Sequence, residues 1–438
     1  MSTLIVNAQL VNEGQVWQAD VLLDQGRIAR IDADLQHLPA QQVIDAKGQY
    51  LLPGVIDTQV HFREPGLTAK GNIASESAAA VRGGTTSFID MPNVNPPTLD
   101  AEALRHKKAI AANTSYANYG FYLGASLDNL EHIKAITRQD ACGIKVFMGA
   151  STGDMLVDHP EVLEAIFANA PLLVSTHCEY SPRINERMAQ ALAKYGPEIP
   201  AELHPWIRDH QACLASSSLA VDLAKRHGTQ LHVLHLTTKD EMALFSDLPL
   251  AQKQITAEAC VHHLWFSDRD YAHKGHLIKC NPAIKTQADQ DALWQALHQG
   301  RIDLIATDHA PHLLSEKQAP YGKAAAGLPL VQHSLMMMLE QVERGRLTLA
   351  QLVHWMCHQP AERFAIRERG YLREGYFADL VLIAAQDYQV RPDNIAYHCG
   401  WSPLQGQNFR WQPSHTWVNG DLAYARGELL ARPRVLAL

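Results

Sequence analysis

The stretch that decides the fold is Val55-Ile56-Asp57-Thr58-Gln59-Val60, a short run with three apolar residues that leads into His61. Short runs of this kind are typical of strands that are buried on both faces in a parallel sheet. Seven further runs follow at 86–91, 117–123, 143–148, 172–176, 230–234, 254–257 and 302–306. Segments with helical periodicity separate most of them, most clearly over 73–81, 100–112, 160–169, 216–226 and 287–297. Eight strand–helix units predict an α/β fold, a (β/α)₈ TIM-type barrel.

The alternative for such a pattern is an open, doubly wound sheet. No G-x-G-x-x-G follows the first run, which leaves that alternative without its usual phosphate-binding motif. Outside the barrel, both ends of the chain contain short strand-like segments, with a turn signal at Asp24-Gln25-Gly26. We therefore expect a small β-sandwich domain built from both termini. The predicted boundaries are 1–52 for its N-terminal part, 53–368 for the barrel and 369–438 for its C-terminal part.

The composition excludes several classes of protein. The 438 residues are 47% hydrophobic and 19% charged, as in an ordinary globular chain and unlike a disordered one. The net charge of −8 offers no general attraction for nucleic acid or an anionic membrane surface. No apolar run reaches the length of a membrane span, and the N-terminus does not resemble a signal peptide. The seven cysteines are scattered and form no C-x-x-C pair, which favours a reducing, cytoplasmic location over disulfides or a thiolate zinc site.

Polar residues suited to metal binding follow the predicted strands at one end. The runs lead into His61, His177, His235, Glu258 and Asp308, while Lys145 lies within the fourth run. Imidazole nitrogens suit zinc, manganese, iron or cobalt, and a carboxylate can bind metal and carry a proton. A free ammonium at Lys145 would repel a cation. Lys145 is therefore either a structural, ion-paired lysine or a lysine that has reacted with CO₂ to form a carbamate ligand.

These residues resemble a known family. Pro53-Gly54-Val55-Ile56-Asp57 leading to His61, the strand of Lys145, His177, His235 and Thr307-Asp308-His309-Ala310-Pro311-His312 are similar to the amidohydrolase superfamily, and more narrowly to the dihydroorotases of its cyclic-amidohydrolase branch. The resemblance covers nearly the whole chain, including Gly370–Gly375 and Ala378-Asp379-Leu380. It implies a barrel with a binuclear, usually zinc, centre. The implied metal ligands are His61, Lys145 as N6-carboxylysine, His177, His235 and Asp308, and Asp308 is also the implied general acid/base.

The resemblance also implies a substrate site. Arg63, Asn93 and His312 would hold the carboxylate of the substrate, Asn281 would contact its ring, and Ala326 and Gly327 would present backbone groups to it. A guanidinium pairs with a carboxylate through two hydrogen bonds. The alternative for Arg63 is a surface salt bridge with Glu64. The implied reaction is the reversible hydrolysis of dihydroorotate to N-carbamoyl-L-aspartate in de novo pyrimidine biosynthesis.

One position departs from the family pattern, in which the first strand ends in His-x-His. Here Gln59 replaces the first histidine, and an amide oxygen is a poorer zinc ligand than imidazole. We therefore expect one tightly bound metal ion and a weaker second one, with Gln59 a doubtful ligand. Among the other histidines, we expect His232 to pack in the core, His309 to point away from the site, and His262 and His263 to orient ligands.

Two rival functions remain. The first is a hydantoinase or dihydropyrimidinase that acts on uncharged rings. The second is a non-catalytic homologue that serves as a scaffold for a partner such as aspartate transcarbamoylase. The sequence leaves a homodimer open, and it predicts neither a nucleic-acid nor a membrane partner.

Overall fold

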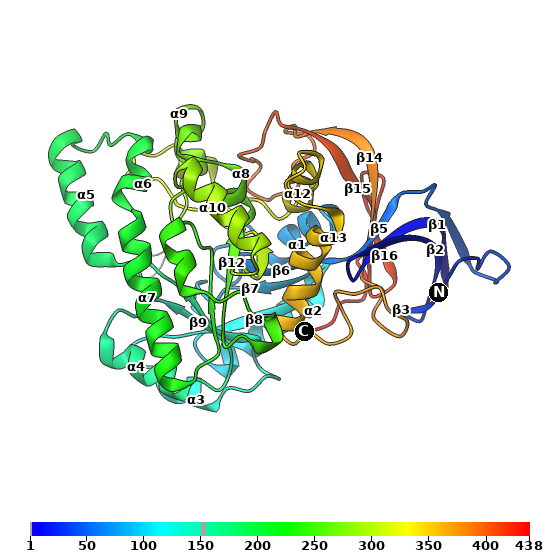
Figure 1. The fold of residues 1–438 in the computed structure, drawn as a ribbon, viewed down its shortest axis with the longest axis horizontal. Coiled ribbons are helices and arrows are strands. Elements are labelled where there is room, and N and C mark those ends of the chain that lie inside the picture. The colour runs from blue at the N-terminus through cyan, green and yellow to red at the C-terminus, as the bar shows by residue number, and fades with distance from the viewer. Residues whose placement is uncertain (1, 150–154) are drawn as a thin grey trace.

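Eight parallel strands form a barrel and follow one another in chain order around it (Figure 1). The computed structural model describes residues 2–149 and 155–438. The barrel strands are β6 (Val55–Val60), β7 (Thr85–Asp90), β8 (Asn118–Gly124), β9 (Gly143–Phe147), β10 (Val174–His177), β11 (Leu231–Val233), β12 (Ile255–Cys260) and β13 (Leu304–Ala306). Almost all of their residues are buried, which explains why the sequence shows continuous runs. The predicted (β/α)₈ barrel is confirmed.

The barrel closes where its first strand meets the segment after its last. Val60 forms a parallel bridge with His309, and the His61 amide donates to the His309 carbonyl oxygen over 2.7 Å. Asp57 strengthens the junction, because its Oδ2 accepts a hydrogen bond of 2.6 Å from the Thr307 hydroxyl. This closure brings the ends of β6 and β13, with the side chains that follow them, to the same rim.

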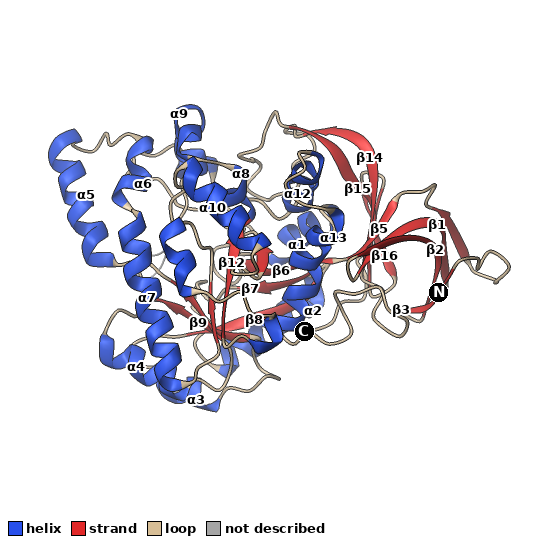
Figure 2. Ribbon diagram, in the orientation of Figure 1, coloured by secondary structure: helices blue, strands red, loops and turns tan. Residues whose placement is uncertain are grey.

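Helices surround the barrel strands, as Figure 2 shows by colour. They are α1 (Ile73–Arg82), α2 (Ala101–Thr114), α3 (Leu130–Ala135), α4 (Pro160–Asn169), α5 (Ser181–Tyr195), α6 (His204–Ile207), α7 (His210–His227), α8 (Val261–Trp265), α9 (Tyr271–Lys274), α10 (Gln287–His298), α11 (Leu314–Lys317), α12 (Ser334–Glu343), α13 (Leu349–Val353) and α14 (Gln359–Arg363). All five predicted helices are present. Helix α7 begins earlier than predicted because the Asp209 carboxylate caps it by accepting from the Ala212 amide.

A second, mixed sheet combines both ends of the chain and lies beside the barrel, at the right in Figure 1. Its N-terminal strands are β1 (Thr3–Asn12), β2 (Gln15–Asp24), β3 (Arg27–Asp32), β4 (Gln42–Asp45) and β5 (Tyr50–Pro53), and its C-terminal strands are β14 (Leu380–Gln389), β15 (Asn408–Val418), β16 (Asp421–Ala425) and β17 (Glu428–Leu429). Antiparallel pairing of β5 with β14 joins the two halves. The exact domain boundaries stay a prediction.

The terminal sheet is tied to the barrel by a buried polar junction. Asp379, just before β14, pairs with Arg369 and accepts a 3.1 Å hydrogen bond from Asn118 in β8. The Gly54 amide, just before β6, donates to the Asp379 carbonyl oxygen over 2.8 Å.

In the part of the chain that the structure describes, no helix has both the length and the apolar character of a membrane span.

Candidate active site

One pocket at the rim of the barrel gathers nearly all of the predicted site residues. It is lined by Gln59, His61, Arg63, Asn93, Lys145, Phe147, His177, His235, Asn281, Asp308, Ala310, Ala326 and Gly327. Most of these residues lie at or just beyond the C-terminal ends of barrel strands, where barrel enzymes place their chemistry. His312 is the one predicted residue outside this lining, and it contacts Arg63 instead.

Two histidines face each other on one side of the pocket. Nδ1 of His177 lies 3.0 Å from Nε2 of His235, while Nε2 of His177 lies 3.0 Å from a carboxylate oxygen of Glu179. Burial alone would raise the pKa of Glu179, but the charge of Arg208 and the hydrogen bond from His177 hold it well below its usual value. An ionised carboxylate only accepts, so Nε2 of His177 carries the proton. The lone pair of His177 is therefore on Nδ1, directed toward His235.

His61 and Asp308 face each other on the opposite side. Nδ1 of His61 donates to the Asn93 side-chain oxygen over 2.7 Å, and Nε2 lies 3.1 Å from Oδ1 of Asp308. Burial alone would raise the pKa of Asp308, but the hydrogen bond and charge of His61 outweigh burial and hold it below its usual value. Gln59 donates from its amide nitrogen to the same Oδ1 over 3.1 Å, while its oxygen accepts from the Cys260 thiol. Gln59 therefore contacts Asp308 as a hydrogen-bond donor.

Lys145 lies in β9, and its side chain is buried. Among the described residues, no carboxylate lies within ion-pair distance of its amine, which lies 4.7 Å from the centroid of the Phe147 ring. Burial lowers the pKa of Lys145 to about 8. A larger fraction of the amine is therefore neutral near pH 7 than for an exposed lysine, and the neutral amine is the form that reacts with CO₂. These observations favour the carbamate alternative over a structural ion pair.

The donor atoms of this pocket fit a divalent metal ion. Nδ1 of His177 presents a lone pair toward His235, Nε2 of His61 faces Asp308, and Asp308 adds a carboxylate. Nδ1 of His235, by contrast, has no hydrogen-bond partner in the described residues. Such a mixture of imidazole and carboxylate is a normal donor set for zinc and similar ions.

Three site residues have left-handed backbone conformations, which are unfavourable for residues other than glycine. The φ angles are 68° at Arg63, 39° at His235 and 48° at Asp308. Each residue lies two or three positions after the last residue of a barrel strand. Backbone strain of this kind costs about 1–3 kcal/mol per residue and is concentrated at functional sites. Here it turns each side chain at the point where the strand ends.

The guanidinium of Arg63 is buried and has no acidic partner among the described residues. Its Nε donates to the Pro311 carbonyl oxygen over 3.0 Å, and Nη2 lies 3.0 Å from Nε2 of His312. Within residues 2–149 and 155–438, no carboxylate lies within ion-pair distance of Arg63, and Glu64 instead accepts from the Ile73 amide. Burial lowers the pKa of Arg63 to about 10, so the side chain remains charged. The alternative of a salt bridge with Glu64 is wrong.

His312 lies behind Arg63, next to an ion pair of 2.8 Å between Lys70 and Glu316. Its Nδ1 lies 3.2 Å from the amine of Lys70, which the sequence analysis missed. Burial, followed by the charge of Arg63, lowers the pKa of His312 to about 3, so the ring is neutral. The Trp401 indole nitrogen donates to the His312 carbonyl oxygen over 2.7 Å and so holds this segment from the C-terminal side.

The loop at Ala326 and Gly327 is held by a second buried lysine. Lys317 donates to the carbonyl oxygens of Lys279, Ala325 and Gly327 over 2.8, 2.8 and 2.9 Å. The Gly327 amide in turn donates to the Lys279 carbonyl oxygen over 2.9 Å. The φ of 145° at Gly327 is unfavourable for other residues, and a Cβ there would lie 2.6 Å from the Ala310 carbonyl oxygen. The loop therefore requires glycine for its close approach to the pocket wall.

Asn281 completes the far wall of the pocket. Its side-chain oxygen is buried, and the described residues offer it no hydrogen-bond partner. This polar atom is positioned to interact with a ligand in the pocket.

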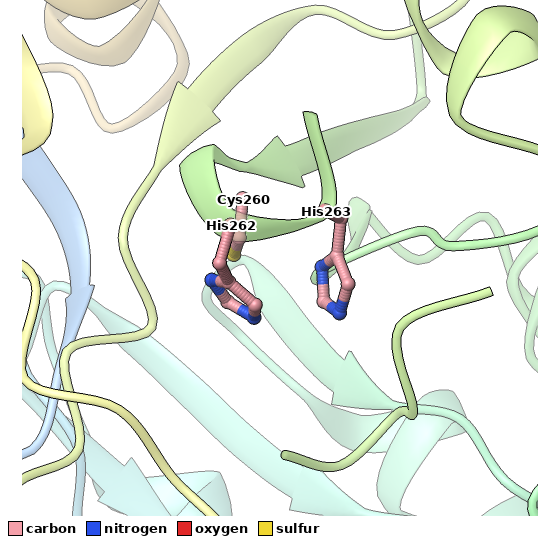
Figure 3. Close-up of side chains that lie close together, drawn as sticks. All are labelled: Cys260, His262 and His263. Atoms are coloured by element: carbon pink, nitrogen blue, oxygen red, sulfur yellow. The ribbon is translucent and has the colours of Figure 1, made fainter. Parts of the chain in front are cut away.

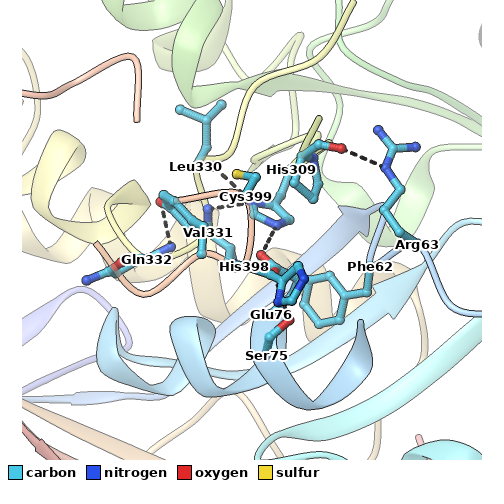
Figure 4. Close-up of polar contacts among 12 residues, drawn as sticks. Phe62, Arg63, Ser75, Glu76, His309, Leu330, Val331, Gln332, His398 and Cys399 are labelled. Carbon is cyan, nitrogen blue, oxygen red and sulfur yellow. Dashed lines mark hydrogen bonds and ion pairs between the residues drawn. The ribbon is translucent and has the colours of Figure 1, made fainter. Parts of the chain in front are cut away.

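His309 points away from the pocket and connects three segments, as Figure 4 shows. Its Nε2 donates to Glu76 of α1 over 2.9 Å, and its Nδ1 accepts from the Leu330 and Val331 amides over 2.9 and 3.2 Å. The other oxygen of Glu76 accepts from the His398 amide over 3.0 Å. This network fixes the residue next to Asp308 and agrees with the prediction that His309 points away from the site.

The remaining histidines differ in their surroundings. His232 packs as predicted, with Thr256 and Glu258 at 2.9 and 3.1 Å from its two nitrogens. His262 and His263 make no hydrogen bond to a predicted metal ligand in the described part of the chain, so no such bond supports their predicted orienting role. Of the residues that the sequence analysis missed, Glu179 carried a signal, because it lies two residues after His177 and an acidic partner commonly orients a ligand histidine. Arg208 and Lys317 carried none.

Comparisons with known proteins agree with this geometry. Residues 50–423 match the amidohydrolase family. A dihydroorotase from Methanosarcina mazei is 31% identical, with 98% of this chain and 95% of that protein covered. An allantoinase from Bacillus velezensis is 28% identical, with 97% and 94% covered. Among solved structures, an L-hydantoinase from Arthrobacter aurescens superposes with a TM-score of 0.93 at 28% identity, over 98% of this chain and 97% of that one. The chain therefore belongs to the amidohydrolase family and is a cyclic amide hydrolase.

Proposed function

We propose that this cyclic amide hydrolase is a dihydroorotase, which interconverts dihydroorotate and N-carbamoyl-L-aspartate in pyrimidine biosynthesis. The observation that carries the proposal is the buried Arg63 guanidinium, which lines the pocket without an acidic partner among the described residues. Leaving a buried charge unpaired is costly. A substrate carboxylate removes that cost by supplying a charge-assisted hydrogen bond.

The carboxylate distinguishes dihydroorotate from the uncharged rings of the rival substrates. Arg63 lies beside neutral His312, whereas Lys70, which contacts the other ring nitrogen of that histidine, is already ion-paired with Glu316. Asn93 is already engaged with His61 and lines the same wall, so it links the proposed carboxylate site to the metal ligands. In this proposal Asn281 contacts the ring. The Ala326–Gly327 loop fits against the ring on the opposite side, with the Gly327 amide already bonded to Lys279.

Asp308 moves the proton in the proposed reaction. As a carboxylate it accepts a proton from the attacking water while the oxygen of that water bonds to the ring carbonyl carbon. It then returns the proton to the ring nitrogen as the carbon–nitrogen bond breaks. The low pKa of Asp308 keeps it ionised in the hydrolytic direction. Ring closure requires the protonated form, so lower pH favours synthesis of the ring.

The metal ligands in this proposal are His61, Lys145 as N6-carboxylysine, His177, His235 and Asp308. A zinc ion bound there would polarise the ring carbonyl and lower the pKa of water. Glu179 and Asn93 fix which nitrogen of His177 and of His61 carries the lone pair. Gln59 donates to Asp308 and so leaves one side of the centre with fewer strong ligands. We propose one tight ion and one weaker ion.

Two alternatives come from different observations. The likeness to a hydantoinase structure favours an uncharged cyclic substrate. Gln59, in place of a histidine, favours weaker metal binding. If metal binding were lost altogether, the protein would be a non-catalytic scaffold for aspartate transcarbamoylase. The full set of remaining ligands in one pocket argues against the scaffold. A cytoplasmic location and a homodimer also stay proposals, and the free cysteines fit a reducing compartment.

A substrate panel tests the proposal. Purified protein of known metal content is assayed with dihydroorotate, dihydrouracil, hydantoin and allantoin under the same conditions. We expect the highest kcat/KM with dihydroorotate. A higher value with an uncharged ring would support the hydantoinase alternative, and no turnover of any ring by metal-loaded protein would support the scaffold.

A further inference from the structure

A cluster of buried ligand-type side chains lies beside the candidate active site without belonging to it. Cys260 ends β12, and His262 and His263 belong to the short helix α8 that follows (Figure 3). The ligand atoms of the three side chains lie within 4.8 Å of one another, and all three residues are buried. Ligand atoms around one tetrahedral zinc ion are about 3.3–3.8 Å apart, given bonds of about 2.0–2.3 Å. Closing the cluster around an ion therefore requires movements of at most about 1.5 Å.

The proton position on His263 prepares this ring to bind a metal. Its Nε2 lies 3.1 Å from the Pro282 carbonyl oxygen. A carbonyl oxygen only accepts, so Nε2 carries the proton and Nδ1 carries the lone pair. Nδ1 is buried and has no hydrogen-bond partner in the described residues. A ligand histidine whose other nitrogen donates to a carbonyl oxygen is a common arrangement in metal sites.

His262, like His263, has a buried ring nitrogen without a hydrogen-bond partner among the described residues. Neither of its ring nitrogens makes a hydrogen bond of good geometry within residues 2–149 and 155–438, although the Thr307 backbone lies nearby. An unsatisfied buried polar group costs about 1–3 kcal/mol. The His262 and His263 ring centroids are 4.0 Å apart, so the two unsatisfied rings share one small space. Both rings have nitrogens without a hydrogen-bond partner in the described residues, and the Cys260 side chain lies close to them (Figure 3).

Cys260 supplies the third ligand. Its thiol donates to the Gln59 side-chain oxygen, with 3.6 Å between the sulfur and that oxygen. A divalent ion displaces the thiol proton, which leaves to solvent, and binds the resulting thiolate. The cluster has the spacing C-x-H-H. The lack of a C-x-x-C pair in the sequence therefore does not exclude it.

We propose that Cys260, His262 and His263 form a second metal site, for a zinc-like divalent ion, separate from the metal centre of the candidate active site. The site goes beyond the proposed function, because none of its three residues lines the catalytic pocket. Gln59 contacts both Cys260 and Asp308, so an ion here would fix the wall between the two sites.

Cobalt substitution tests this site through a signal that activity does not provide. Metal-free protein is loaded with Co²⁺, and near-ultraviolet absorption and cobalt content are measured. A cobalt–thiolate bond gives an intense charge-transfer band, and none of the residues proposed for the catalytic centre is a cysteine. We expect this band in the wild type and in Lys145→Ala, in which the catalytic centre is disrupted. Retention in Lys145→Ala separates this site from the proposed function.

Cys260→Ser should abolish the band and remove one equivalent of cobalt, while Cys142→Ser, at another buried cysteine, should keep both. His263→Gln should also reduce cobalt content by one equivalent, which tests the site if the serine variant does not fold. The proposal is wrong if wild-type protein binds cobalt without the band, takes up no cobalt, or keeps the band in folded Cys260→Ser.

Discussion

The amide nitrogen of Gln59 donates a hydrogen bond to Oδ1 of Asp308 over 3.1 Å, while the amide oxygen accepts from the thiol of Cys260. At the position where the family pattern has a metal-binding histidine, this chain therefore presents a hydrogen-bond donor to the proposed general base. The contact orients the Asp308 carboxylate but adds no lone pair to the metal centre.

Gln59 is therefore expected to make the two catalytic ions unequal. In the Cys260→Ser background, which removes the separate thiolate site, we expect one tight ion, one weaker ion, and activity that rises when divalent metal is added. Gln59→His should tighten the second ion, because imidazole is the better ligand. Equilibrium dialysis with elemental analysis measures both affinities, and two equally tight ions before the substitution would contradict this expectation.

Asp308→Asn should leave a folded protein that binds substrate but turns it over about 10²- to 10⁴-fold more slowly, because an amide cannot transfer the proton. The melting temperature and the binding of a non-hydrolysable substrate analogue serve as controls. Retention of a tenth of the wild-type kcat by the variant would show that another group carries the proton.

Arg63→Ala should reduce kcat/KM for dihydroorotate by a factor that corresponds to about 2–4 kcal/mol, since it removes a charge-assisted pair. The effect on dihydrouracil, which lacks the carboxylate, should be much smaller. Steady-state kinetics on both substrates with the same preparation make the comparison. Equal losses would mean that Arg63 acts through its contacts with Pro311 and His312 and so supports the structure of the rim.

Lys317→Met should lower kcat/KM about ten- to hundredfold, because three carbonyl oxygens lose their common donor and the pocket loop shifts. Lys323→Met is the matched control, because Lys323 is an exposed lysine in the same loop. Kinetics and thermal melting of both variants separate a local effect from a general loss of stability. Unchanged kinetics in folded Lys317→Met would exclude this role.

The Glu179 carboxylate should make stability depend on pH in the acid range. Its pKa is lower in the folded chain than the usual value of about 4.3, so its contribution is complete above that value and is lost as the pH falls. In metal-free protein, the difference in free energy of unfolding between wild type and Glu179→Gln should be constant above about pH 5 and shrink below about pH 4. Denaturant unfolding measures it, with exposed Glu161→Gln as the control. A difference that persists unchanged to low pH would contradict the ionised pairing with Arg208.

The strands and most ligand positions could be predicted from the sequence because each relies on local signals. The strands that contain Val55 and Ile144 are buried on both faces, as expected in a parallel sheet, and His61 and His177 come at strand ends. Helix α5 was not among the predicted helices, and only Ser181, Ile184 and Ala191 of its residues are buried.

The supporting residues could not be predicted because their partners are distant in sequence. Arg208 meets Glu179 across 29 positions, and Lys317 meets Lys279 across 38. A lysine or an arginine in the sequence does not signal burial, since both residue types are usually exposed. Only the folded barrel reveals that these charges are enclosed and which carbonyl or carboxylate oxygens satisfy them.

The most direct test of the central claim is the ratio of kcat/KM for dihydroorotate to that for dihydrouracil, measured on protein of known metal content. The account predicts a ratio well above one in the wild type that falls sharply in Arg63→Ala, because the buried guanidinium recognises the ring carboxylate. A wild-type ratio at or below one would contradict the assignment of dihydroorotate as the substrate.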